Sequence, residues 1–424
     1  MLLFLGLCLA IQNNPLEEFT NGSKNEFSWK HVETREYKGG KLHTLFLISQ
    51  IWQGRQWKHE LEIYEPKQQD YPGKAIFIVT GNRGKHDDDL ENAYKLGDIA
   101  RMAVVVLYDI PNQPLFDNLS EDDLMAYTFV KYLETQQPDW VLLFPMTRSV
   151  VRAMDAVSEY TKEKTQAKVD KFVLTGASKR GWTAYLVASL DKRIIGLAPM
   201  VFDMLHIEEQ LKHQKELWGD YSPELKPYVE AGLMDWVDKP QGKKLIALVD
   251  PYFYMRKMLM PKFLILGAND TFWTLDALSL YWDRFELAKY VFYVPNSGHG
   301  LEDRKRVLNT LAAFSRIVAS RRALPIIQWT WIVTGGAGKF PSTAILKLDT
   351  PYSKKQRLWL ARSGSANFSH AKWVKVYEQE NGSEFAVPGP DNSNGYRAVI
   401  GEAEFEVDGI PYWVSTLPLI LRGG

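Results

Sequence analysis

Short, unbroken runs of apolar residues recur along the middle of the chain, and stretches with helical spacing lie between them. Strands that are buried on both faces of a parallel sheet have this appearance, because neither face meets water. One helix is expected from Ser120 to Leu133, and the next has Val150, Met154 and Val157 on one face. The pattern predicts an α/β fold wound on a mostly parallel sheet. The apolar runs span residues 75–79, 102–108, 172–174, 194–199, 263–266 and 291–294.

The flanking regions carry different patterns. Residues 42–50 and 57–64 read as an antiparallel hairpin with its turn near Gly54. Between about 203 and 260 the runs give way to amphipathic, aromatic-rich helices (206–218 and 223–236), which is typical of a cap over the strand ends where such sheets bind ligands. Strand-like runs at 326–333, 357–361, 373–377, 398–400 and 412–417 indicate a separate β-sandwich-like domain over 325–424.

Residues 176–182 (GASKRGW) stand between the strand at 172–174 and a helical stretch from Trp182 to Leu190. Strand, Gly-x-Ser and helix in succession form a nucleophile elbow, in which a sharp turn exposes the serine hydroxyl above the sheet. The usual pattern has glycine two residues after the serine, and this chain has Arg180 there. The motif predicts Ser178 as a nucleophile in an α/β-hydrolase domain covering 25–324.

A serine nucleophile needs a base and an orienting acid, which follow it in the order acid, histidine in hydrolases of this fold. His299 lies on a glycine-flanked loop directly after the last apolar run, and we expect it to be the base. Asp270 follows the strand at 263–266 and is the expected acid, with Asp276 as the alternative and Asp203 and Asp250 as more distant ones.

The oxyanion hole is expected to use the backbone N–H of Lys179 and a second N–H from the loop at Gly81 and Asn82. Two interpretations of the Lys179 and Arg180 side chains stay open. They could favour a substrate that bears a carboxylate, or Arg180 could pair with a structural acid while Lys179 faces solvent.

Composition and charge narrow the class of protein. Lys plus Arg and Asp plus Glu both number 51, so no net field attracts nucleic acid or an anionic membrane. Residues 1–10 are apolar and too short to span a bilayer, and they predict a signal peptide cleaved near Ile11. Cleavage would remove Cys8, the only cysteine, and with it any disulfide. Sequons at Asn21, Asn118, Asn367 and Asn381 are weak support for a secreted glycoprotein.

The chain resembles the PhoPQ-activated pathogenicity-related family, a group of α/β-hydrolase-like secreted proteins, from about residue 27 to the C-terminus. The resemblance implies that arginine is normal at position 180, that Ser178 is the nucleophile and His299 the base, and that the acid is an aspartate after the strand at 263–266. Some relatives carry an acidic residue where this chain has Thr271, and an aspartate near Asp276, so the choice of acid stays open. The matching stretches are 49–52, 57–59, 139–146, 176–183, 249–252, 261–262 and 293–299.

We therefore expect a secreted (extracellular or periplasmic) serine hydrolase that acts on a small-molecule or peptide substrate through an acyl-enzyme. We expect no cofactor and no metal, no nucleic-acid partner and no stable membrane insertion. His206 and His213 lie seven residues apart without a zinc-binding pattern, and His86 with residues 87–89 is expected to be a solvated loop. The alternative is a secreted signalling or binding protein on a hydrolase scaffold, for which a protein partner is conceivable.

Overall fold

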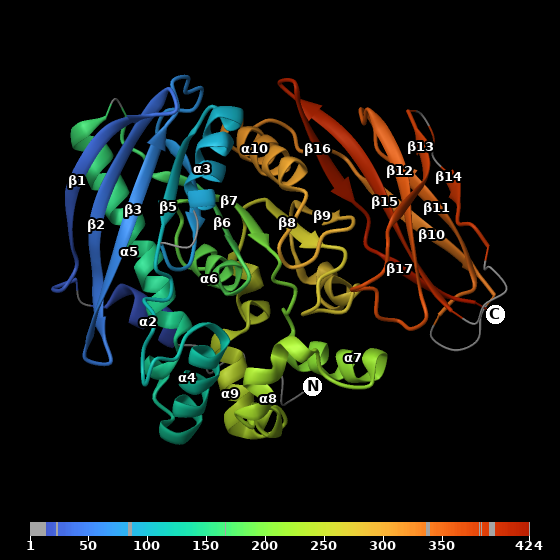
Figure 1. Ribbon diagram of the computed structural model, residues 1–424, viewed down its shortest axis with the longest axis horizontal. Helices are drawn as coiled ribbons and strands as arrows, with labels where there is room; N and C mark the ends of the chain where they lie inside the picture. The colour runs from blue at the N-terminus through green and yellow to red at the C-terminus, as the bar shows by residue number, and fades with distance from the viewer. Residues whose placement is uncertain are drawn as a thin grey trace.

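The fold is built around one large mixed sheet, shown in Figure 1. The computed structural model describes residues 14–22, 24–83, 87–165, 167–335, 340–380, 382, 384–389 and 395–423. Along the sheet the strands follow the order β1 (Ser28–Tyr37), β2 (Gly40–Trp52), β3 (Arg55–Glu65), β5 (Ala103–Leu107), β4 (Lys74–Val79), β6 (Lys171–Ala177), β7 (Ile194–Met200), β8 (Lys262–Gly267) and β9 (Lys289–Val294).

The pairing directions identify the architecture. Strands β1, β2, β3 and β5 pair antiparallel, whereas β5, β4, β6, β7, β8 and β9 pair parallel. In register, Val79 of β4 lies opposite Gly176 of β6, so the strands end together at one edge. An antiparallel start that leads into parallel strands joined by helical crossovers is the α/β-hydrolase arrangement. The predicted fold class is confirmed.

Helices cover both faces of this sheet, because successive strand residues are buried on opposite sides. Phe77 packs into a core shared with α5 (Leu143–Lys164) and α6 (Lys179–Ala188). Its neighbour Ile76 packs into a second core with α3 (Asp87–Ala100) and α10 (Arg304–Ser320). The strands are therefore almost wholly apolar, as the runs without alternation require.

A helical cap lies at the carboxyl ends of the parallel strands, beside α4 (Glu121–Thr135) (Figure 1). The stretch 223–236 is not the single helix we expected, because Gly232 takes a left-handed conformation with φ 70° and divides it. Ser120 does precede α4, but its side chain makes no capping hydrogen bond. The elements of and after the cap are α7 (Ile207–Trp218), η2 (Pro223–Leu225), α8 (Lys226–Glu230), η3 (Leu233–Trp236), α9 (Pro240–Val249), η4 (Pro251–Lys257), η5 (Ala277–Leu280) and η6 (Trp282–Arg284).

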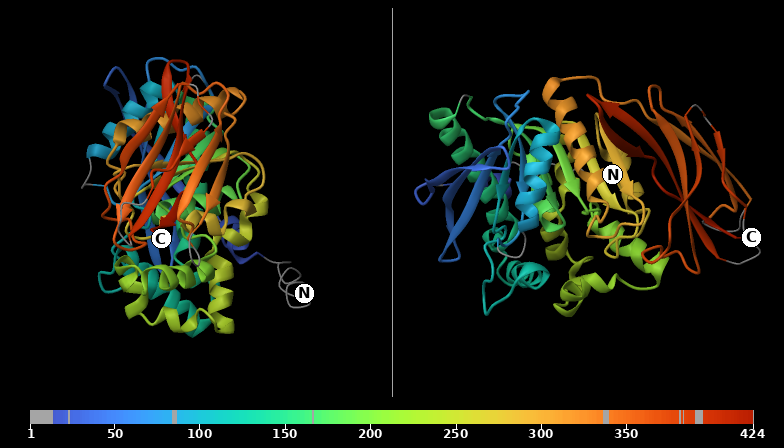
Figure 2. Two further views of the ribbon diagram at one scale, coloured as in Figure 1. Left: turned by 90° about the vertical axis from the view of Figure 1, so that its right-hand side faces the viewer. Right: turned by 45° about the horizontal axis from the view of Figure 1, so that its top comes forward.

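The C-terminal part forms two antiparallel sheets packed face to face, beyond β9 and α10 (Figures 1 and 2). Leu346 from one sheet and Leu358, Leu360 and Val399 from the other share a buried core, which makes the domain a β-sandwich. One sheet has the order β10 (Gln328–Thr334), β11 (Thr343–Asp349), β14 (Glu384–Ala386). The other has β13 (Val374–Gln379), β12 (Lys355–Ser363), β15 (Tyr396–Val407), β16 (Ile410–Ser415), with β17 (Leu419–Arg422) beside β15.

The sandwich is packed firmly on the large sheet. The rings of Phe292 and Trp413 stack with centroids 6.1 Å apart, and the Arg306 guanidinium lies over both. The backbone N–H of Tyr293 donates to Ser415 Oγ at 3.1 Å. Strand β9, which leads into the loop that carries His299, is therefore braced from outside by the C-terminal domain.

The N-terminal leader that we expect at residues 1–10 lies outside the described residues, as do His86 and the sequon asparagine at 381. The remaining elements are α2 (Pro15–Asn21), which packs near the start of α5, and η1 (Pro138–Trp140). In the part of the chain that the structure describes, no helix has the length and apolar character needed to cross a bilayer.

Candidate active site

Ser178 sits on a tight turn between β6 and α6. Its backbone has φ 58° and ψ −129°, a conformation that costs a residue with a side chain free energy and that is typical of nucleophile elbows. Its N–H donates to Met200 O at 2.9 Å, and its own carbonyl accepts from Trp182 N at 3.0 Å. Gly181 provides the close approach, because a Cβ there would lie 2.9 Å from Gly176 O. The required glycine is thus displaced by one position, which frees position 180 for arginine.

Arg180 joins three segments at the elbow. Its guanidinium donates to both carboxylate oxygens of Glu121 at 2.8 Å, and its Nε donates to Ile110 O at 2.6 Å. It also lies against Gly81, where a Cβ would be 2.6 Å from the nearest guanidinium nitrogen. Of the two interpretations offered by the sequence, the arginine therefore pairs with an acid of the protein itself.

Lys179 does not face solvent, contrary to the expectation paired with that interpretation. Its side chain is only 7% exposed, and Nζ lies 2.7 Å from Glu121 Oε2 and 3.2 Å from Asp122 Oδ2. Burial opposes the charge on Glu121, but Arg180 and Lys179 outweigh it and hold the pKa of that carboxyl well below its usual range. These carboxylate partners could not be predicted from the sequence, because they lie almost sixty residues away on α4.

Asp270 and His299 are brought together by the ends of neighbouring strands β8 and β9. His299 Nδ1 lies 2.8 Å from Asp270 Oδ2 and 3.1 Å from Oδ1, and the carboxylate also accepts from Phe272 N at 2.9 Å. The Asp270 side chain is 5% exposed, whereas that of His299 is 27% exposed. A buried carboxylate at Nδ1 orients the ring and leaves Nε2 as the nitrogen that can exchange a proton.

Asp276, the alternative acid, has a different partner. Its Oδ1 lies 2.8 Å from Nε2 of His213 on the cap helix α7. His206 does not share a helix face with His213, because it precedes α7 in a left-handed conformation and stacks on Tyr252 at 4.1 Å. Asp276 therefore joins its loop to the cap, and Asp270 is the carboxylate that contacts His299.

Two asparagines, Asn269 and Asn296, tie the loops that carry Asp270 and His299 to the C-terminal sandwich. Asn269 Nδ2 donates to Phe368 O at 2.9 Å and to Ala371 O at 2.7 Å. Asn296 exchanges two hydrogen bonds with the backbone of Trp373, at 3.0 and 2.8 Å. We call Asn269 and Asn296 the asparagine clamp. The clamp could not be predicted from the sequence, since a single asparagine in a loop carries no sign of its distant partner.

The loops that carry Asp270 and His299 also touch each other directly. Gly267 ends β8 where a Cβ would lie 2.2 Å from Gly298 O and 2.6 Å from Ser297 O. The N–H of Asn269 donates to Ser297 O at 2.9 Å. Only a residue without a side chain at 267 permits this approach.

A further carboxylate, Asp203, is completely enclosed behind this pair. It accepts a hydrogen bond from Tyr281 Oη at 2.6 Å, and burial raises its pKa to about 8. Burial therefore favours the protonated, uncharged form of Asp203 near neutral pH, which limits the negative charge beside Asp270.

The two expected donors of the oxyanion hole lie at the start of α6 and on the loop after β4. Lys179 is the first residue of α6, so its N–H belongs to the helix N-terminus. Gly81 and Asn82 follow β4 at the same edge of the sheet, and Gly81 O accepts from Asp109 N at 2.8 Å. Their role as donors stays a prediction.

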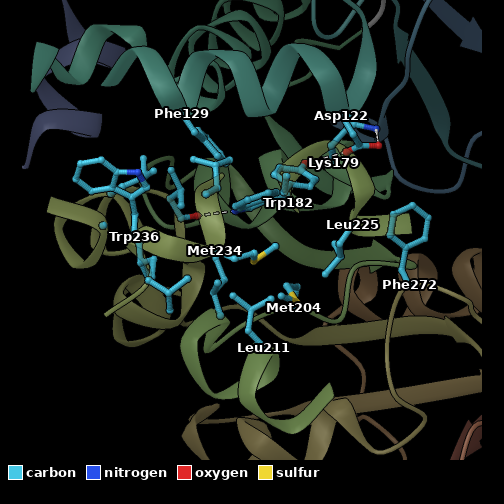
Figure 3. Close-up of a pocket in the computed structure, with 18 of the residues that line it drawn as sticks. Asp122, Phe129, Lys179, Trp182, Met204, Leu211, Leu225, Met234, Trp236 and Phe272 are labelled. Atoms are coloured by element: carbon cyan, nitrogen blue, oxygen red, sulfur yellow. Dashed lines mark hydrogen bonds and ion pairs between the residues drawn. The ribbon is translucent and has the colours of Figure 1, made fainter. Parts of the chain in front are cut away.

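Ser178 opens onto a cavity of about 120 Å³ between α4, α6 and the cap, shown in Figure 3. Phe272 links the cavity to His299, because it lines the wall and packs on the His299 ring with centroids 4.3 Å apart. Apart from Ser178, Lys179, Asp122 and Tyr228, the lining is apolar or aromatic and includes Phe129, Trp182, Met204, Leu211, Met234 and Trp236.

Other residues of the family-like stretches build the scaffold. Ser49 Oγ lies 2.9 Å from His59 Nε2, but both residues are buried and His59 Nδ1 is bonded to the carbonyl of Tyr108. Lys262 is also buried, donates to Met258 O and Glu286 O, and has its pKa lowered to about 8 by burial. Within the described residues, no group of three or more His, Cys, Asp or Glu side chains is arranged to hold a metal ion.

Comparison with known proteins gives both a family and structural relatives. The family model described as PhoPQ-activated pathogenicity-related protein matches residues 16–368. Autocrine proliferation repressor protein A of Dictyostelium discoideum is 31% identical over 382 residues, which cover 85% of this chain and 76% of the relative. Acetyl xylan esterase of Paenibacillus sp. R4 is 15% identical, with a TM-score of 0.48, over 69% of this chain and 91% of that chain. Acetyl xylan esterase 1 of Thermoanaerobacterium sp. JW/SL YS485 is 15% identical, with a TM-score of 0.46, over 68% and 90%.

Proposed function

The chain belongs to the family of PhoPQ-activated pathogenicity-related proteins, and we propose that it is a secreted serine hydrolase that cleaves ester or peptide bonds through an acyl-enzyme. The observation that carries the proposal is the 2.8 Å contact between Asp270 and His299, at the same sheet edge as Ser178 on its strained turn. A pure binding protein has no need of this combination.

In the proposed reaction, Ser178 Oγ attacks the substrate carbonyl while His299 Nε2 takes the hydroxyl proton. The same imidazole then gives that proton to the leaving group as the bond to it breaks, and water repeats the sequence to release the acid. Asp270 holds the Nδ1–H and stabilises the imidazolium. The backbone N–H groups of Lys179 and of the loop at Gly81 and Asn82 are the proposed donors to the oxyanion.

A fluorophosphonate probe tests the nucleophile. Wild-type protein should become labelled between about pH 6 and 9, the range in which a histidine base is expected to be active, and Ser178→Ala should not. Ser189→Ala, at the opposite end of α6, is the matched control and should label as the wild type does. Absence of labelling in folded wild-type protein would refute the proposal.

The acid is tested by comparing two conservative substitutions. Asp270→Asn should lower kcat by about four orders of magnitude, the scale measured when an orienting aspartate is replaced. Asp276→Asn should change kcat only a few-fold, because Asp276 contacts His213 and not His299. The reverse ranking would assign the acid to Asp276.

The proposal that the protein is secreted rests on the apolar residues 1–10. It is tested by sequencing the N-terminus of the mature protein. Expression with the native leader should deliver protein to the periplasm or medium, with its first residue near Ile11. Treatment with an N-glycosidase should lower the apparent mass in a eukaryotic host if Asn118 or Asn367 is modified.

A second function is favoured by the relative named Autocrine proliferation repressor protein A. In this proposal the secreted chain acts as a signal through a protein partner, with or without hydrolysis. Adding purified wild type and Ser178→Ala to proliferating cells separates the two functions. Equal repression by both would support signalling without catalysis, and repression by wild type alone would make catalysis part of the signal.

A further inference from the structure

The cavity beside Ser178 has aromatic and aliphatic walls that are held rigidly. The Trp182 ring stacks on Phe202 with centroids 4.9 Å apart, and Phe129 meets its edge at 6.1 Å. On the cap side the wall is closed by a tight contact, because a Cβ at Gly242 would lie only 1.8 Å from Trp236 O. The walls thus form one packed unit, so we treat the cavity as preformed.

Asp122, Lys179, Tyr228 and Trp182, which line this cavity, already have hydrogen-bond partners within the protein. Asp122 accepts from Lys179 Nζ at 3.2 Å and from Tyr228 Oη at 2.8 Å. The indole N–H of Trp182 donates to Val249 O at 2.5 Å. A charged group placed deep in the cavity would lose its hydration and would meet Asp122 and Lys179 already paired with each other, which is strongly unfavourable. The indole N–H of Trp273, which has no hydrogen-bond partner among the described residues, offers a single neutral donor.

Size limits the ligand further. An engineered apolar cavity of about 150 Å³ binds benzene, and this cavity measures about 120 Å³. We propose that it selects substrates that carry an uncharged, apolar group of about six carbons, a chain or a ring, on one side of the scissile carbonyl bond. The inference rests on the proposed function of Ser178 but concerns what the cavity beside it accepts.

Substrate series provide the kinetic test. In p-nitrophenyl esters from acetate to hexanoate, or in acetates of alcohols from ethyl to hexyl, kcat/KM should rise about fourfold per methylene, which corresponds to about 0.8 kcal/mol. The series that shows the rise identifies the side of the bond that enters the cavity. Flat profiles in both series, with measurable turnover, would overturn the proposal.

A pair of leucines on α7 offers a matched control. Leu211 lines the cavity and Leu217, on the same helix, does not. In the series that rises for wild type, Leu211→Trp should fill the cavity and reduce the ratio of kcat/KM between the six-carbon and the two-carbon substrate to near one. Leu217→Trp should keep the wild-type ratio, and equal ratios in the two variants would contradict the proposal.

Binding to Ser178→Ala protein makes the result independent of catalysis. Hexanamide should change the tryptophan fluorescence and bind at least tenfold more tightly than acetamide, and this preference should vanish with Leu211→Trp. Adipamic acid has the same six-carbon length as hexanamide, with a carboxylate in place of the terminal methyl group. It should bind at least tenfold more weakly than hexanamide. Equal affinity for all three amides would overturn the proposal. Failure of fluorophosphonate labelling with selective hexanamide binding would instead refute only the hydrolase function.

Discussion

Substitution of one residue of the asparagine clamp, Asn269→Ala, should lower kcat while leaving KM nearly unchanged. The change removes two hydrogen bonds, at 2.9 and 2.7 Å, that hold the loop carrying Asp270 to Phe368 O and Ala371 O of the sandwich. Each such bond contributes about 1 kcal/mol, and the carbonyls left behind add a desolvation cost, so we expect a loss of about 2–4 kcal/mol. This loss destabilises the native conformation of the loop relative to open conformations. Asp270 and His299 are then in contact for only a small fraction of the time, and kcat falls at least tenfold.

The assay combines steady-state kinetics on a hexanoate ester with urea unfolding. KM is expected to hold because the clamp does not line the cavity. Asn112→Ala is the matched control, because the Asn112 side chain also exchanges two hydrogen bonds with the backbone, here that of Lys58. Asn112 lies far along the sheet from the loops that carry Asp270 and His299. An unchanged kcat in Asn269→Ala, or an equal loss in Asn112→Ala, would refute the positioning role.

Three further predictions address the surroundings of the site. Gly267→Ala should displace the base loop and abolish fluorophosphonate labelling, because its Cβ would meet Gly298 O at 2.2 Å, whereas Gly364→Ala, with open space around it, should label normally. Glu121→Gln should lower the free energy of unfolding by about 1–2 kcal/mol at pH 7. Because the folded pKa of Glu121 is depressed, wild type should lose this advantage as the pH falls below about 4.5, and urea titrations across pH should show it. Asp203 keeps its proton up to about pH 8 when folded, while the unfolded carboxyl releases it near 3.8, so wild-type stability should fall as pH rises from 5 to 8. Asp203→Asn should remove that slope, which is at most about 1.4 kcal/mol per pH unit, and an unchanged slope would contradict the assignment.

The strands of the large sheet, and the order of the candidate site residues along the chain, were predictable because each rests on a local sequence pattern. Every apolar run in the middle of the chain became a strand, since full burial on two faces leaves a continuous signal. β11 was not predicted although Ala344, Leu346 and Leu348 alternate with exposed residues, because the exposed Ile345 interrupts the alternation of apolar and polar side chains. The broken helix at 223–236 was missed because amphipathic spacing is insensitive to one left-handed glycine at 232.

The site was only partly predictable for a different reason. Ser178, Asp270 and His299 each follow a strand, so chain order alone places them at one edge of the sheet. The partners of Lys179 and Arg180 could not be predicted, because ion pairs across sixty residues leave no periodic trace. The same holds for Asn269 and Asn296, whose acceptors belong to another domain.

The pairing of Lys179 and Arg180 with Glu121 and Asp122 has a kinetic consequence. Both cations at the elbow are neutralised within a few ångströms, and the whole chain has equal numbers of basic and acidic residues. Little electric field therefore extends into solvent from these groups to guide an approaching molecule. Added salt has little effect, because there is hardly any long-range attraction for it to screen. Encounter with Ser178 is then governed by diffusion and by the shedding of water from an apolar group, so it proceeds at nearly the same rate in dilute and in concentrated salt.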